Sequence, residues 1–154
     1  MKKLKSFRRF DMDQFELRRL HPYNASDIIA WNKLLQSSQT YFLQNCGAPA
    51  RNDAAQKLFS DIPKGKTESD KYVFALFDGA QMIGFADLIR GYPRPEVVSI
   101  RLFIIAESHQ GAGLGADLFA RVAELTASWN CQEIQLGVCA SNTNGLKFWQ
   151  RAGF

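Results

Sequence analysis

The chain has 154 residues, of which 46% are hydrophobic and 22% charged, a balance typical of one soluble globular domain. This composition excludes a disordered chain, and the apolar runs fall far short of the roughly 18 residues that span a bilayer, so no membrane partner is expected. The three cysteines show no C-x-x-C spacing. They favour a reducing, cytoplasmic location and predict neither a disulfide framework nor a metal site.

The net charge of +4 comes from the start of the chain, where residues 1–9 hold five lysines and arginines and no acidic residue. The other 145 residues carry 14 basic and 15 acidic side chains. Because a nucleic-acid-binding protein usually spreads positive charge over a face of its fold, we expect no nucleic-acid partner. The sequence predicts a basic tail over residues 1–13 and a single domain over residues 14–154. A weaker alternative is nucleic-acid binding through this tail.

The first half of the chain predicts one strand and two helices. Alternating residues at 15–20 predict the strand. Residues 24–27 offer N-caps for a helix that runs through residue 35, and a second helix is expected over residues 51–59 after a loop at 45–49. The polar, turn-rich stretch 61–70 predicts a surface loop.

The second half of the chain predicts a sheet with one crossover helix. Strands at 72–77 and 82–89 form a predicted hairpin around Asp78-Gly79, and the apolar run 97–105 predicts a central strand covered on both faces. A helix over 113–129, a strand over 133–138 and a short helix over 143–151 follow. This order predicts an α/β (α+β) domain with a mixed, mostly antiparallel central sheet, helices on both faces and one βαβ crossover.

A glycine-rich turn, Gln110-Gly111-Ala112-Gly113-Leu114-Gly115-Ala116, joins the apolar strand to the long helix. Glycines let the backbone turn sharply and approach a ligand closely, while the first N–H groups and the dipole of the helix favour a phosphate. The chain lacks a Walker A triplet, and too few strand–helix units follow the turn for a dinucleotide-binding fold, although its spacing matches a relaxed dinucleotide fingerprint. The turn therefore predicts a phosphate site of another kind.

Two segments of the chain resemble one known family. Residues 110–115 resemble the Q/R-x-x-G-x-G/A motif of the GNAT superfamily of acyl-CoA N-acyltransferases. Residues 142–154 resemble that family's N-x-x-A-x-x-[FY]-[YFW]-x-x-x-G-F segment, and the two lie in the family's order, separated by one helix and one strand. The resemblance covers about residues 15–154 in the order of elements.

This resemblance implies a GNAT-like fold with splayed central strands and acetyl-CoA as the cosubstrate. It implies that backbone groups of a strand pair with the pantetheine arm, that N–H groups of the glycine turn hold the pyrophosphate, and that the N–H of Ile105 stabilises the oxyanion. The implied cofactor-binding residues are Phe103, Ile104, Ile105, Gln110, Gly111, Ala112, Gly113, Leu114, Gly115, Ala116, Asn142 and Trp149. The implied activity is transfer of an acetyl group to a primary amine of a small molecule or peptide by direct attack; the alternative is a non-catalytic acyl-CoA-binding module.

The chain departs from the family at both positions where acid–base chemistry is expected. Trp149 stands where many members carry a Tyr that protonates the leaving thiolate, and Ser99 aligns with the Glu base of histone-type members. The carboxylates nearby in the sequence are those of Asp87, Glu96 and Glu107. A chain of water molecules to bulk solvent is an alternative base, so no catalytic residue is assigned.

The acceptor side of such a fold is implied to come from the first helices and their loop. Tyr41, Phe42 and Asn45 are the residues expected to line it. The family usually adds a last strand after the segment that ends here at Phe154, so this strand is absent, supplied by a neighbour or encoded by further sequence. A homodimer is therefore one of the open oligomeric states.

Overall fold

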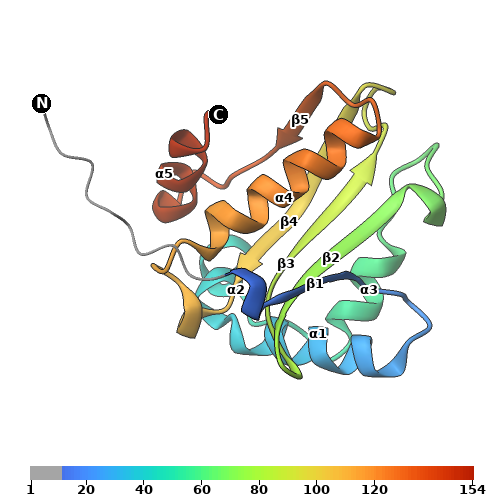
Figure 1. Cartoon of the computed structure of the whole chain (residues 1–154). Coiled ribbons are helices and arrows are strands. Elements are labelled where there is room, and N and C mark those ends of the chain that lie inside the picture. The colour runs from blue at the N-terminus through green and yellow to red at the C-terminus, as the bar shows by residue number, and fades with distance from the viewer. Residues whose placement is uncertain (1–11) are drawn as a thin grey trace, which may run out of the picture.

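The computed structural model describes residues 12–154, so residues 1–11 of the predicted tail lie outside the described residues. The described chain forms a five-stranded sheet with helices on both faces (Figure 1). The strands are β1 (Glu16–Arg19), β2 (Lys71–Asp78), β3 (Gln81–Arg90), β4 (Val97–Ile105) and β5 (Glu133–Leu136). The helices are α1 (Ala25–Ser37), α2 (Gln39–Cys46), α3 (Ala54–Ser60), α4 (Leu114–Ser128) and α5 (Thr143–Arg151), with single turns η1 (Met12–Gln14), η2 (Glu68–Asp70) and η3 (Glu107–His109).

The strands lie in the order β1-β2-β3-β4-β5. The first four are antiparallel to their neighbours, and only β4 and β5 are parallel. The predicted hairpin is confirmed, since Asp78 pairs with Gln81 across a turn in which Gly79 has a φ of +57°. Helix α4 makes the crossover from β4 to β5 along one face of the sheet (Figure 1). The mixed, mostly antiparallel sheet with one βαβ crossover is therefore confirmed.

The middle strand is β3, and not β4 as the apolar run at 97–105 predicted. Every residue from Met82 to Ile89 is buried, because β3 has a full-length neighbour on each side and helices on both faces. β4 is an interior strand, but it is less buried because β5 covers only its first four residues. The length of an apolar run therefore located an interior strand without locating the centre of the sheet.

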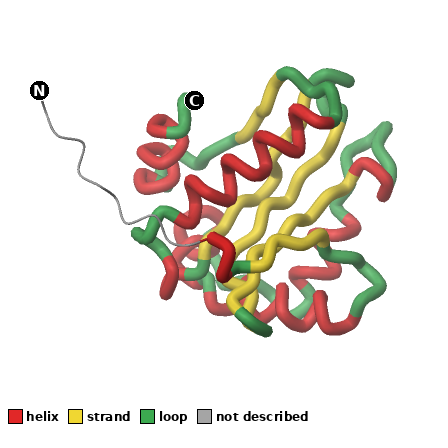
Figure 2. Tube along the Cα trace, viewed as in Figure 1, coloured by secondary structure: helices red, strands yellow, loops and turns green. Residues whose placement is uncertain are grey.

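Helices lie on both faces of the sheet (Figure 2). Two apolar clusters fill the layers between these helices and the sheet. On the face of α1 and α3, the Trp31 ring packs edge-on against Phe59 and Phe85, with ring centroids 4.8 and 5.1 Å away. On the other face, Leu118 and Val122 of α4 are fully buried against the sheet. No helix within residues 12–154 is both long enough and apolar enough to cross a bilayer.

Two elements differ from the sequence-based expectation. Helix α2 occupies residues for which no helix was predicted; none of its residues is buried, so it lacks the periodic apolar stripe that would have indicated it. Strand β5 ends at Leu136, two residues before the predicted end. It ends there because its pairing with β4 stops at Ile100.

Candidate active site

The two parallel strands part at a β-bulge in β4. Opposite the step from Asp87 to Leu88 in β3, β4 carries one extra residue, Arg101. A bulge bends its strand and increases the local twist. The pairing of β4 with β5 stops immediately before this bulge, at Ile100 and Leu136. The predicted splaying of β4 from β5 is confirmed, and it begins at the bulge.

Beyond the bulge, the backbone groups of β4 point alternately toward β3 and away from it. The N–H of Ala106 donates to a β3 carbonyl at 2.8 Å, so the alternation of an antiparallel ladder directs Ile104 toward β3 as well. The same alternation directs the N–H and C=O groups of Phe103 and Ile105 away from β3. In agreement, the carbonyl of Ile105 accepts a 2.9 Å hydrogen bond from the side-chain amide of Gln110.

The glycine turn opens the N-terminus of α4 to solvent. Gly111 and Gly113 have φ angles of +79° and +86°, which L side chains rarely adopt, and a Cβ on either would meet no atom within 4 Å. Gly113 is the N-cap of α4, and no side chain caps this helix. The N–H of Asp117 makes the first helical bond, to the carbonyl of Gly113. The N–H groups of residues 114–116 therefore have no partner within the helix.

The other residues of the turn divide between the core and the surface. Leu114 is 2% exposed and packs in the core. A Cβ on Gly115 would lie 3.1 Å from the Phe148 ring, so this glycine permits the close packing of α4 against α5. Ala112 is half-buried and Ala116 is exposed. The turn thus has one packed side and one open side, on which an anion has access to the backbone.

Asn142 and Trp149 have structural roles in α5. The side-chain oxygen of Asn142 accepts the Gly145 N–H at 2.9 Å and so caps the helix. Trp149 is 8% exposed and lies among aromatic rings of α4, α5, the chain end and β4. The rings that it contacts are those of Phe103, Phe119, Phe148 and Phe154. Trp149 is therefore part of the core.

A pocket of about 470 Å³ opens where β4 and β5 part. It is lined by Leu58 and Asp61 at the end of α3, by Asp87 of β3, by residues 99–102 of β4, and by residues 135–137 at the end of β5. Leu58, Asp61 and Asp87 place the pocket on the α1–α3 side of the sheet, beside the bulge. The pocket therefore gives a second molecule access to the point at which the strands separate.

A buried ion pair stands at the wall of this pocket. Asp87 is 1% exposed and Lys71 is 6% exposed, and the Lys71 Nζ lies 2.7 Å from Oδ1 and 2.8 Å from Oδ2 of Asp87. Only the contact with Oδ2 has hydrogen-bond geometry, and Oδ1 has no hydrogen-bond partner. Burial raises the pKa of the Asp87 carboxyl to about 6, although the Lys71 ammonium acts to lower it. Arg101 adds a second ion pair, 3.5 Å from Asp61.

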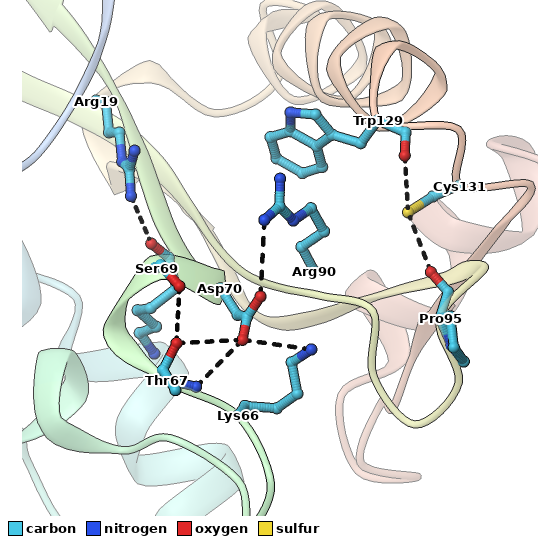
Figure 3. A network of polar contacts seen from close by, with 10 residues as sticks. Arg19, Lys66, Thr67, Ser69, Asp70, Arg90, Pro95, Trp129 and Cys131 are labelled. Carbon is cyan, nitrogen blue, oxygen red and sulfur yellow. Dashed lines mark hydrogen bonds and ion pairs between the residues drawn. The ribbon is translucent and has the colours of Figure 1, made fainter.

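Polar contacts hold the turn that precedes Lys71 (Figure 3). Lys71 begins β2 directly after η2, where Thr67 and Asp70 form a capping box. The Asp70 carboxylate lies 3.7 Å from the Arg90 guanidinium, and the Arg19 guanidinium donates to the Lys71 carbonyl at 2.9 Å. Lys71 is not among the site residues predicted from the sequence; the available signal was a single acidic residue, Asp87, within the apolar run of β3.

The other two carboxylates that the sequence suggested lie elsewhere. Glu107 accepts the Thr40 N–H at 3.2 Å, at the start of α2. Glu96 precedes the opposite end of β4 and pairs with Arg94 at 2.9 Å. Neither Glu107 nor Glu96 lines the pocket.

The α2 residues that the sequence placed on the acceptor side, Tyr41, Phe42 and Asn45, are not among the residues that line the pocket. Tyr41 is half-buried, and its carbonyl accepts the side-chain amide of Asn45 at 2.8 Å. Burial above all, and then the thiols of Cys46 and Cys139, raise the pKa of Tyr41 to about 12. A phenol this weakly acidic is poorly suited to protonate a thiolate at neutral pH.

Comparison with known proteins identifies the class. The fold is shared with an acetyltransferase from Thermus thermophilus, at a TM-score of 0.74 and 25% identity over 92% of this chain and 86% of that one. An aminoglycoside acetyltransferase from an uncultured soil metagenomic sample, in complex with sisomicin, has a TM-score of 0.66 and 14% identity over 92% of this chain and 89% of that one. A ribosomal-protein-alanine N-acetyltransferase from Brucella melitensis has a TM-score of 0.66 and 14% identity over 91% of each chain.

The model of the acetyltransferase (GNAT) family matches residues 30–154. The chain therefore belongs to the GNAT acetyltransferase family, and it is an acyltransferase enzyme. Within residues 12–154, no group of three or more His, Cys, Asp or Glu side chains is placed to hold a metal ion.

Proposed function

We propose that this enzyme transfers the acetyl group of acetyl-CoA to a primary amine of a small molecule or peptide, in the cytoplasm. The observation that carries the proposal is the open turn at the N-terminus of α4, next to the unpaired edge of β4. Members of the family generally use acetyl-CoA, and the geometry of this turn fits its phosphates. The non-catalytic alternative is not favoured, because the family and the neighbours named above are acetyltransferases.

The turn would hold the pyrophosphate through backbone groups alone. The sequence has no lysine or arginine between Arg101 and Arg121, so no cation of the turn itself is available to the phosphates. The N–H groups of residues 111–116 and the positive end of the α4 dipole supply the attraction instead. The open space around Gly111 and Gly113 leaves room for the anion to approach the backbone closely.

The edge of β4 would hold the pantetheine arm as an added strand does. Phe103 and Ile105 direct their backbone groups to this edge, whereas Ile104 faces β3, so we assign the pairing to the first two. The thioester would then lie beside β4, where the Ile105 N–H points away from β3 and so is on the correct side to stabilise the developing oxyanion. An amine that enters from the pocket meets the acetyl carbonyl there, and the positioning of two bound reactants contributes much of the rate.

The test is the substitution Gly113→Glu. A carboxylate at this point of the turn repels a diphosphate and blocks the space above the N–H groups, so we expect acetyl-CoA affinity to fall at least about tenfold. Titration calorimetry measures the affinity, and mass spectrometry of an amine panel measures the acetylated products.

The matched control is Gly65→Glu. Gly65 has the same φ of +86° and the same open space, but it lies in the loop before β2. This substitution introduces the same backbone strain and the same charge away from the turn, and should leave acetyl-CoA affinity unchanged. If wild-type protein does not bind acetyl-CoA, or if both variants lose affinity equally, the proposal is wrong.

A further inference from the structure

Of the three carboxylates that the sequence suggested, Asp87 is the one that lines the pocket. It lies in the middle of β3, directly opposite Leu102 and beside the bulge at Arg101. Its side chain is on the α1–α3 side of the sheet and lines the pocket through which an amine would approach. Burial of an ionisable group in the wall of a pocket is typical of a functional site.

One oxygen of this carboxylate lacks a hydrogen bond. Lys71 donates to Oδ2, while Oδ1 is buried without a hydrogen-bond donor of suitable geometry. A buried acceptor without a donor is costly, so it is rare unless a ligand or water supplies the missing bond. An ammonium group in the pocket is a donor of the correct charge. Oδ1 also lies 2.7 Å from the Lys71 Nζ as part of the ion pair, but that contact lacks hydrogen-bond geometry and leaves the acceptor unsatisfied.

We propose that Asp87 is the general base that takes the proton from the acceptor ammonium; this assignment rests on the proposed function. One ammonium proton passes to the Asp87 carboxylate and from there to bulk water. The neutral nitrogen then attacks the acetyl carbonyl, the C–N bond forms and the C–S bond breaks. A second proton leaves the nitrogen and neutralises the CoA thiolate, so that amide, CoA and one released proton result.

The charged groups around Asp87 suit this role. Lys71 of β2 and Arg101 of β4 lower its pKa, while burial and the Asp61 carboxylate raise it. Burial dominates, and the resulting pKa of about 6 leaves the group ionised at neutral pH but a stronger base than an exposed aspartate. An alkylamine with a pKa near about 10 is protonated at neutral pH and needs such a base before it can attack.

The experiment compares two probe amines that differ in their need for a base. Butylamine is protonated at neutral pH, whereas trifluoroethylamine is largely neutral. Asp87→Asn should reduce kcat for butylamine at least about 100-fold, but change kcat for trifluoroethylamine by no more than about threefold. Lys71→Met should shift the acid limb of the butylamine pH profile upward by about one pH unit or more, because Asp87 then loses its cation. A purely structural role for the pair predicts equal losses with both amines and an unshifted profile.

Three further measurements keep the outcomes distinct. The double variant Asp87→Asn/Lys71→Met removes both buried charges. If Asp87→Asn alone does not fold, the double variant is assayed in its place and should show the same loss of kcat for butylamine but not for trifluoroethylamine. Glu96→Gln removes a carboxylate outside the pocket and should match wild type. Acetyl-CoA binding by calorimetry should be retained in every variant.

Asp87→Asn protein that binds acetyl-CoA and acetylates butylamine at nearly the wild-type rate overturns the assignment of Asp87 and leaves the proposed function standing. Wild-type protein that binds acetyl-CoA but acetylates neither amine nor any member of the panel overturns both.

Discussion

At the start of α5, the side chain of Asn142 occupies the space that a methyl group on Gly145 would fill. The Asn142 oxygen accepts the Gly145 N–H at 2.9 Å, and a Cβ on Gly145 would lie 2.6 Å from the side-chain nitrogen of Asn142. Alanine in place of glycine within a helix gains about 1 kcal/mol, and loss of an N-cap costs about 1 kcal/mol. Gly145→Ala should therefore change the free energy of unfolding by less than about 0.5 kcal/mol in wild type. In an Asn142→Ala background it should stabilise by about 1 kcal/mol. Urea unfolding of the four proteins in the cycle measures the coupling, and strict additivity would contradict the shared space.

Single residues also differ in how well the sequence can indicate their part in the site. Gly111 and Gly113 could be predicted because the need for a positive φ is a local property of a turn. The partner of Asp87 could not, because Lys71 is 16 residues away and only the register of β2 against β3 brings the two together. Nor does the sequence show that Glu107 bonds instead to the start of α2. Long-range pairing decides which of several carboxylates faces the pocket.

At the scale of elements, α5 is attached to the domain through an aromatic cluster centred on one of its side chains. Trp149 is its single buried residue and contacts rings of α4 and β4. Trp149→Ala should lower the free energy of unfolding by about 3–5 kcal/mol and accelerate amide exchange in α5 more than in the sheet. Phe154→Ala, which truncates a 48% exposed ring of the same cluster, should cost clearly less. Equal costs, or unchanged exchange in α5, would show that the helix is held by other contacts.

The elements also show where periodicity stops being informative. The α4 stripe and the β2–β3 hairpin were predicted because each has a strong local pattern. Helix α2 was not, because it buries no residue. The early end of β5 coincides with the bulge at Arg101 in another strand, and Gly137 is a weak local signal for it. The parting of strands that makes the site is therefore a property of two elements together.

At the scale of the whole molecule, the buried pair should leave a mark on stability as a function of pH. The pKa of Asp87 rises from its ordinary value of 3.8 to about 6 on folding, mainly through burial. Between these values the folded protein keeps a proton that the unfolded chain has released, so stability falls as pH rises through this window. The shifts at Asp70 and Glu96 have the opposite sign. Burial acts to raise the pKa of Asp70, but the hydrogen bond from the Thr67 N–H and the contacts with Lys66 outweigh burial and lower this pKa. A backbone N–H and Arg94 lower the pKa of Glu96.

The stability contributed by Asp70 and Glu96 is therefore lost only on acidification below about pH 4, and because both carboxyls are little buried it is small. Thermal unfolding of wild type and of Asp87→Asn/Lys71→Met should be followed from about pH 4 to pH 7. Relative to the double variant, wild type should lose stability up to about pH 6 and then stay level, since Asp87 is by then ionised in both states. A difference curve that is flat, or that rises across this window, would mean that the carboxyl facing the pocket carries no raised pKa. It would also remove the match between this group and a base that works near neutral pH, independently of any assay of acetyl transfer.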